Sequence, residues 1–291
     1  MSEWVIGIIG GSGLYAIDAL EDAQWLAVET PWGAPSDELL IGRIGDVRFV
    51  FLPRHGRGHR IPPSHLNARA NIDALKRAGC TDILAISAIG SLREEIPPGH
   101  FVAVDQFIDR TVAREASFFG PGFTAHVSMA DPVCPRLSSL AGDAAEAAGA
   151  PVTRGGCYLA MEGPQFSTRA ESRAYRAWGA DVIGMTAMPE AKLAREAELP
   201  YALLGMVTDF DCWRAGEEAD VAAIVARLHD NAAVARRLVV ELARRLPKKR
   251  TPSPIDTSLD TAVITASDAR DPAMTAKLDA VCRRFLRNLA R

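Results

Sequence analysis

The feature that most constrains the fold of this chain is an alternation of short apolar runs with segments of helical spacing. Runs such as residues 83–86 and 201–207 are almost wholly apolar, which is typical of strands buried on both faces of a sheet. Segments such as residues 135–148 and 189–198 lie between such runs and favour helices. The pattern predicts an α/β fold in a single domain, with a central mixed β-sheet flanked by helices.

Length and charge narrow the class of protein. The chain has 291 residues, 48% of them hydrophobic, and a formal net charge of -3, so it can bury a large core but carries no basic footprint for nucleic acid or an anionic membrane. No apolar run reaches the roughly 18 residues that a membrane span needs. Five cysteines without a CxxC pair favour a reducing, cytoplasmic compartment. We therefore expect neither a nucleic acid nor a membrane as partner.

The C-terminal region differs in composition from the rest. Residues 247–265 are rich in Pro, Ser, Thr and Lys, which is typical of a linker or an extended crossing arm. Residues 272–289 predict one helix that packs on the same domain or on a neighbouring subunit, through an apolar stripe of Met274, Leu278, Val281, Phe285 and Leu289. We expect a main domain over residues 1–246, a linker or arm over 247–265 and a C-terminal helix within 266–291.

Two carboxylates end the apolar run at residues 201–207. Asp209 and Asp211 are two positions apart, so a strand that continued to them would place both side chains on one face. Two such close acids cannot both ionise easily, and one of them can keep a proton for a leaving group. The alternative interpretation makes both of them solvated loop residues that cap the following helix.

Two loops after predicted strands carry groups that suit an anion. The run Gly10-Gly11-Ser12-Gly13 lets backbone N–H groups converge, and Ser12 adds a hydroxyl. It does not fit the Gly-x-Gly-x-x-Gly fingerprint of dinucleotide-binding proteins. Arg54 and His55 follow another strand and suit a phosphate or a carboxylate. A tight turn without a ligand is the alternative for the glycine run.

Further loops add hydroxyl groups and an aromatic ring at strand ends. Ser87 and Ala88 follow one apolar run, and Thr186 precedes a predicted helix, whose N-terminus is favourable for an anion. Phe166 offers an aromatic face to a flat heterocycle. Ligands bind beyond strand ends in sheets of this class, although close packing is the alternative for the small residues and a core position for the phenylalanine.

The histidines near residue 55 are candidate metal ligands. His55 and His59 are four residues apart and His65 follows, but glycines and prolines around them oppose the helix that would align the pair. No carboxylate has the matching spacing. We expect no metal.

Motifs in order along the chain resemble the trimeric purine nucleoside phosphorylase family, and within it the members that act on S-methyl-5'-thioadenosine. The resemblance covers residues 5–213 and extends through a long helix to 246. The motifs are IGIIGGSGL, RHGRGH, NIDALK, GSLREEIPPG, DQFIDRT, EGPQFSTRAES, MTAMPEAKLARE and TDFDCW.

The resemblance implies a reaction and an assembly. Inorganic phosphate, as co-substrate, attacks C1' of S-methyl-5'-thioadenosine and releases adenine and 5-methylthio-ribose 1-phosphate. It also implies a homotrimer and no organic or metal cofactor. An ionised carboxylate accepts from the 6-amino group of adenine and a protonated one donates to N7, whereas the members that act on 6-oxopurines carry Asn where Asp209 stands.

The resemblance also implies roles for individual residues. The positions that match the phosphate site are Ser12, Arg54, His55, Ser87, Ala88 and Thr186. The positions that match the nucleoside site are Phe166 beside the base, Met185 under the ribose, the acidic pair Asp209 and Asp211 as catalytic and base-recognition groups, and His126, lent by a neighbouring subunit near the 5' end.

The sequence departs from the family pattern in four places. Gln165 replaces an Arg, Ile89 a Cys, Gly184 an Asn and Ala222 a larger Val. The change at Ala222 leaves open a broader or 6-oxopurine-shifted enzyme, such as a methylthioinosine or adenosine phosphorylase. A catalytically silent nucleoside-binding protein and a nucleotide-dependent oxidoreductase are hypotheses from other classes. The intact polar set argues against the first and the unfitted dinucleotide motif against the second.

Overall fold

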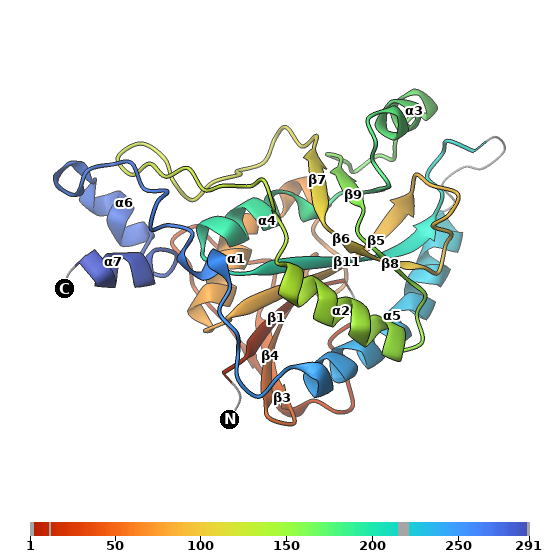
Figure 1. Ribbon diagram of the computed structural model, residues 1–291, viewed down its shortest axis with the longest axis horizontal. Helices are drawn as coiled ribbons and strands as arrows, with labels where there is room; N and C mark the ends of the chain where they lie inside the picture. Colours follow the sequence, from red (N-terminus) through yellow and green to blue (C-terminus); the bar gives the residue numbers. More distant parts are fainter. Residues whose placement is uncertain (1–2, 12, 215–220, 290–291) are drawn as a thin grey trace.

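The computed structural model describes residues 3–11, 13–214 and 221–289. Within these residues one mixed sheet of eleven strands forms the framework (Figure 1). Its centre is β5 (Asp82–Ser91), which pairs in parallel with β1 (Val5–Gly10) and with β11 (Tyr201–Asp209), while β4 (Val47–Pro53) lies parallel to β1. The parallel core brings the C-terminal ends of these four strands to the same edge of the sheet.

The remaining strands extend the sheet on both sides. They are β2 (Glu21–Leu26), β3 (Leu39–Ile44), β6 (Phe101–Val104), β7 (Gln106–Asp109), β8 (Val152–Arg154), β9 (Cys157–Ala160) and β10 (Val182–Gly184). β10 is antiparallel to β5 and parallel to β9, and β6 is antiparallel to β11. Pairs of both kinds in one sheet confirm the predicted mixed topology.

Helices cover both faces of the sheet (Figure 1). The α-helices of the described residues are α1 (Ala68–Arg77), α2 (Pro135–Ala147), α3 (Arg169–Ala177), α4 (Ala187–Glu196), α5 (Val221–Arg245), α6 (Pro272–Lys277) and α7 (Arg283–Leu289), of which α1, α2, α4 and α5 pack on the sheet. One apolar cluster packs α1 and α4 on the sheet through residues such as Ile72 and Leu193, and a second packs α2 and α5 through Leu137 and Leu238. The predicted α/β fold is confirmed.

The prediction of one C-terminal helix over residues 272–289 is wrong. α6 ends at Lys277, α7 begins at Arg283, and Ala280, Val281 and Cys282 between them are all buried. Cys282 joins the apolar cluster beside Val281, a contact outside the stripe that was expected for one helix. Asp279, in the same turn, pairs with Arg77 of α1.

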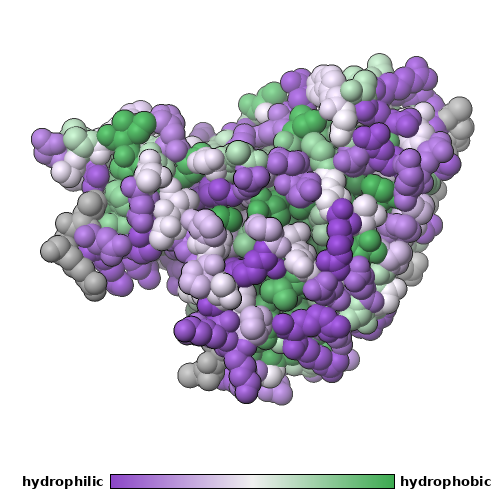
Figure 2. Space-filling view, viewed as in Figure 1, coloured by the Kyte–Doolittle hydropathy of each residue, from purple (hydrophilic) through white to green (hydrophobic). Residues whose placement is uncertain are grey.

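The two C-terminal helices and the segment at residues 116–127 form a projection from the body, which Figure 2 shows from the side used in Figure 1. Ala125 forms an isolated bridge with Val263, in the segment that precedes α6. The Arg270 guanidinium lies 5.1 Å from the Phe123 ring and 5.4 Å from the Phe285 ring. Cation–π contacts thus tie the projection together.

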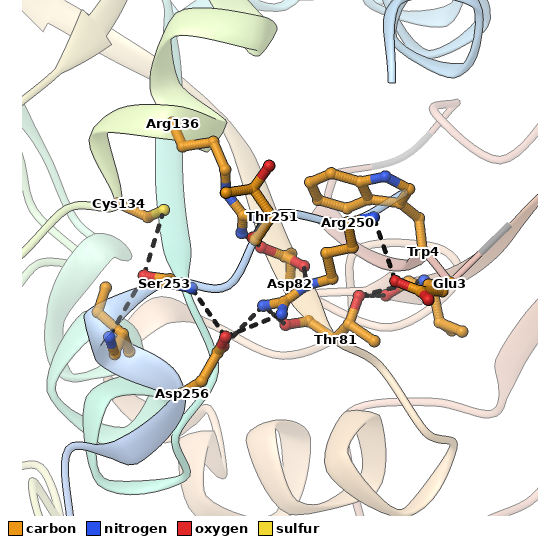
Figure 3. Close-up of polar contacts among 12 residues, drawn as sticks. Glu3, Trp4, Thr81, Asp82, Cys134, Arg136, Arg250, Thr251, Ser253 and Asp256 are labelled. Carbon is orange, nitrogen blue, oxygen red and sulfur yellow. Dashed lines mark hydrogen bonds and ion pairs between the residues drawn. The ribbon is translucent and has the colours of Figure 1, made fainter. Parts of the chain in front are cut away.

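A buried ion-pair cluster fixes the segment after α5 to the sheet (Figure 3). The fully buried carboxylate of Asp82, at the start of β5, pairs with Arg136 of α2 and, at 2.6 Å, with Arg250. Arg250 also pairs with Asp256 at 2.7 Å, and the Trp4 indole donates to the Pro247 carbonyl at 2.8 Å. The chain beyond α5 is therefore held at the N-terminal ends of β1 and β5.

The contact between β5 and β11 depends on a glycine. Gly205 pairs with Ser87 in the parallel ladder, and a Cβ added to it would lie 2.2 Å from Cδ1 of Ile89. The isoleucine that replaces the family's cysteine therefore fits because the facing position has no side chain.

We predict that Gly205→Ala lowers the free energy of unfolding by about 1–3 kcal/mol, because the added methyl overpacks the site. Ile89→Val removes the Cδ1 atom and should cost about 0.5–1.5 kcal/mol alone. In the double variant the two costs should be less than additive, which urea denaturation of all four proteins measures. Strict additivity would show that Ile89 is not what excludes a side chain at Gly205.

Candidate active site

A cavity of about 300 Å³ lies at the C-terminal ends of β1, β4, β5, β10 and β11. Its lining contains nine of the eleven predicted site residues, namely Arg54, His55, Ser87, Ala88, Phe166, Met185, Thr186, Asp209 and Asp211. Ser12 and the side chain of Ala222 lie outside the described residues. The fold thus collects segments from many parts of the chain at one edge of the sheet, as expected for this class of sheet.

Arg54 is the buried cation of this cavity. Its Nε and Nη2 atoms donate to the two carboxylate oxygens of Glu190 at 2.6 and 3.2 Å, and Nη1 donates to the Ile86 carbonyl at 3.0 Å. Burial opposes its charge, but Glu190 outweighs this and raises the Arg54 pKa. The protein therefore holds the guanidinium in place. An anion can bind only to the N–H groups that these bonds leave unused.

His55 presents an acceptor rather than a charge. Its Nδ1 lies 2.8 Å from the Ile61 carbonyl, and a carbonyl only accepts, so Nδ1 carries the proton. Burial, and secondarily the charge of Arg54, lowers the His55 pKa to about 4. The neutral ring stacks on His59 at 4.2 Å. Its Nε2 lone pair can accept an O–H, such as that of a monoprotonated phosphate.

Two hydroxyl groups complete this end of the cavity. Ser87 is buried, and its Oγ has no hydrogen-bond partner among the described residues. A buried unpaired hydroxyl is costly unless a ligand or water satisfies it. Thr186 stands at the N-cap position of α4, where the helix favours an anion.

Tyr158 holds the backbone of Thr186 in place. Its fully buried hydroxyl accepts the Thr186 backbone N–H at 3.3 Å. A Cβ on Gly184 would lie 2.1 Å from that hydroxyl oxygen, so the tyrosine takes the space that the family's Asn side chain would need. No sequence motif marks Tyr158, because its role depends on a contact between neighbouring strands.

The acidic pair forms the opposite end. The Asp209 carboxylate accepts the Asp211 backbone N–H at 2.7 Å and the Thr208 hydroxyl at 2.6 Å. β11 ends at Asp209, and Asp211 follows in a left-handed turn with φ 52°. Asp211 is buried, and its Oδ2 has no partner in the described part of the chain.

Burial sets the proton affinity of this pair. It raises the pKa of Asp209 against the hydrogen bonds from Thr208 and Asp211. Burial also raises the pKa of Asp211, which the negative charge of Asp209 raises further. The interpretation of both acids as solvated helix caps is therefore wrong, and the pair can hold one proton beside one carboxylate.

Apolar side chains line the space between the two ends. Ile89, Met185 and Met206 form walls, and Phe166 keeps 46% of its surface exposed at the rim. A flat, weakly polar ligand group fits between such walls.

His126 lies elsewhere in the chain. It borders a separate cavity of about 400 Å³ with Lys192 and Glu196, and its backbone N–H donates to the Ala262 carbonyl at 2.8 Å. Within one chain, the structure does not bring this histidine to the other predicted site residues.

The described residues contain no group of three His, Cys, Asp or Glu side chains placed to hold a metal ion. None of the described helices combines the length and apolarity required to cross a membrane.

Comparisons with known proteins agree with this geometry. Residues 5–244 match the model of the phosphorylase superfamily. The S-methyl-5'-thioadenosine phosphorylase of Cereibacter sphaeroides is 59% identical, over 97% of this chain and 99% of its own, and that of Bradyrhizobium diazoefficiens is 57% identical, over 99% and 100%.

Solved structures of similar fold belong to proteins of the same kind. A methylthioadenosine phosphorylase from an antarctic soil metagenomic library superposes with a TM-score of 0.91 at 43% identity, over 97% of this chain and 99% of its own. The Schistosoma mansoni methylthioadenosine phosphorylase in complex with adenine has a TM-score of 0.76 at 39% identity, over 83% and 91%.

The geometry of Arg54 yields a prediction with two separable parts. Arg54→Ala leaves Glu190 as an unpaired buried carboxylate, so the free energy of unfolding should fall by about 3–5 kcal/mol. The same change should weaken the binding of inorganic phosphate. Arg54→Met with Glu190→Met should recover most of the stability but not the phosphate affinity, as urea denaturation and calorimetric titration will show. A double variant that binds phosphate normally would remove Arg54 from the site.

Proposed function

Because the chain belongs to the phosphorylase superfamily, we propose that it catalyses phosphorolysis of S-methyl-5'-thioadenosine to adenine and 5-methylthio-ribose 1-phosphate. The reaction is a pentosyl transfer with inorganic phosphate as co-substrate. The observation that carries the proposal is the polarity of one cavity. Arg54 and the Ser87 hydroxyl, which has no partner among the described residues, lie at one end and a buried pair of acids lies at the other. Such a cavity can hold an anionic nucleophile and protonate a leaving base in the same complex.

At the phosphate end the proposed roles follow from charge and hydrogen bonding. Ser12, Ser87 and Thr186 supply hydroxyl groups, and the small Ala88 leaves room for the anion. The lone pair of neutral His55 accepts the O–H of the monoprotonated phosphate, while Arg54 lowers the energy of the negative charge. Positioning beneath C1' then makes the attack effectively unimolecular.

At the base end the acidic pair acts as general acid and as selector. As the bond to C1' breaks, negative charge develops on the purine, and the protonated acid donates to N7. The ionised acid accepts from the 6-amino group. A 6-oxopurine places an acceptor against that carboxylate, which costs about 1–3 kcal/mol for each mismatched buried group. Phe166 and Met185 bound the base and the ribose.

The assembly and cellular setting belong to the same proposal. We assign a homotrimer in which the projection that carries His126 reaches a neighbouring subunit's site near the 5' end, since within one chain His126 borders a different cavity. The enzyme needs no metal or organic cofactor in this proposal. The five cysteines are free, which supports a reducing, cytoplasmic location.

The direct test incubates the enzyme with S-methyl-5'-thioadenosine, with and without phosphate, and follows adenine by chromatography. We expect adenine release that requires phosphate, with a sugar 1-phosphate formed in equal amount. Release at the same rate without phosphate would identify a hydrolase instead. Parallel assays with adenosine and methylthioinosine separate the proposed enzyme from a broader or 6-oxopurine-shifted phosphorylase.

Asp209→Asn should shift the choice of base. An amide can donate to a 6-oxo group, so kcat/KM for S-methyl-5'-thioadenosine should fall about 10- to 100-fold and that for methylthioinosine should rise. Asp143→Asn, a surface change in α2, is the matched control and should leave both values unchanged. Unaltered selectivity in Asp209→Asn would show that this carboxylate does not contact the 6-position.

A further inference from the structure

Arg114 uses every donor of its guanidinium on the protein. Its side chain is only 6% exposed. Nε donates to the Glu162 carboxylate at 2.9 Å, Nη1 to the carbonyls of Met185 and Met188 at 2.6 and 2.7 Å, and Nη2 to those of Met161 and Glu162 at 3.5 and 2.6 Å. Five N–H groups thus meet five acceptors.

The four carbonyls belong to the segments that follow two neighbouring parallel strands, β9 and β10. Met161 and Glu162 follow β9, and Met185 and Met188 bracket the start of α4. Met161 and Met185 line the cavity, whereas Arg114 and Glu162 are not among the described residues that do. Arg114 therefore joins the two loops without forming part of the lining.

Arg114 also holds the start of α4. Met188 has the non-helical angles φ -113° and ψ 133°, so the backbone changes direction at this residue. Its carbonyl accepts Nη1 of Arg114 at 2.7 Å, and this contact fixes the backbone where it enters the regular helix. Thr186 lies between the two carbonyls that Arg114 holds, so the clamp fixes the backbone on both sides of a phosphate ligand.

Glu162 orients the arginine. One of its carboxylate oxygens accepts Nε of Arg114, and the other accepts the backbone N–H groups of Val112 and Ala113 at 2.6 and 3.2 Å. Burial opposes the negative charge, but these hydrogen bonds hold the Glu162 pKa below its usual range. The loop that carries Arg114 is thus pinned to the loop that Arg114 holds.

We propose that Arg114, oriented by Glu162, is a positioning residue that sets the spacing between the loop after β9 and the turn from Met185 to Met188. Arg114 does so from outside the cavity lining. It keeps the surface beneath the ribose and the Thr186 hydroxyl in fixed relative positions. The inference rests on the proposed phosphorolysis for its kinetic consequences but not for the contacts themselves. Asp209 ends β11 and Asp211 follows in the next turn, so the acidic pair lies outside the clamp.

The kinetic test compares Arg114→Met with the wild-type protein. A displacement of about 1 Å at the turn can cost about 10²-fold in rate, so kcat/KM for S-methyl-5'-thioadenosine should fall by about that factor and the phosphate KM should rise. The Kd of adenine, measured by calorimetry, should stay within about twofold, because the acidic pair that recognises the base lies outside the clamp. A merely structural role would not separate these two readouts.

The chemistry of the clamp gives two further variants. Arg114→Lys should restore little activity, since an ammonium has three donors and no planar fork to bridge four carbonyls. Millimolar guanidinium added to Arg114→Ala should restore part of kcat by refilling the site. Recovery with lysine but not with guanidinium would show that charge alone matters and would overturn the proposal.

Arg250→Met provides the matched control. Arg250 is also a largely buried arginine with several protein acceptors, but it lies at the N-terminal ends of the strands (Figure 3). Its loss should lower the unfolding temperature without changing kcat/KM below that temperature. All variants are compared where circular dichroism shows them folded.

Hydrogen exchange separates this inference from the proposed function. Peptides covering residues 183–190 should exchange faster in Arg114→Met than in the wild-type protein or in Arg250→Met. Unchanged exchange there, or kcat/KM within twofold of wild type, would overturn the clamp. A wild-type protein that releases no adenine would overturn the function, and the exchange result would still decide the role of Arg114.

Discussion

The buried ion pair of Arg54 and Glu190 is the interaction on which the phosphate end of the cavity depends. Arg54 follows β4 and also donates to the carbonyls of Ile9 in β1 and Ile86 in β5. Glu190 comes from α4 and accepts the Tyr201 hydroxyl of β11 at 3.2 Å. A buried pair repays its desolvation only when its remaining donors and acceptors are satisfied. That requirement ties segments of four strands to one helix around an arginine that lines the cavity.

The same burial gives the cavity its two unlike ends. Desolvation raises the pKa of both Asp209 and Asp211, and Arg54 is not among the charges that shift either of them. If the cation lay beside the acids it would lower their pKa and remove the proton that a leaving purine needs. Apolar walls such as Ile89 and Met206 stand between the ends. Separation of charge across one cavity therefore lets it stabilise an anionic nucleophile and still act as an acid.

Sequence alone could predict the residues that face a ligand, because strand ends are marked by apolar runs followed by small or polar residues. It could not predict the residues behind them. Glu190, Tyr158 and Arg114 act through partners 136, 28 and 47 or more positions away, and the residues around them do not indicate those partners. The break between α6 and α7 was missed for a related reason, since burial on several sides comes from tertiary packing. The structure therefore supplies the contacts between segments that are distant in sequence, which local sequence patterns do not contain.

The departures from the family pattern show how the walls can change while the polar ends stay fixed. Ile89 fits because Gly205 faces it, and Gly184 is needed because the Tyr158 hydroxyl fills the space beside it. In each case close packing leaves room for one large side chain between neighbouring strands, so an enlargement at one position demands a glycine at the other. The Tyr158 hydroxyl also makes a polar contact here, because it accepts the Thr186 backbone N–H. Positions in these walls are therefore constrained as pairs, because the volume that one side chain takes must be left free by its neighbour.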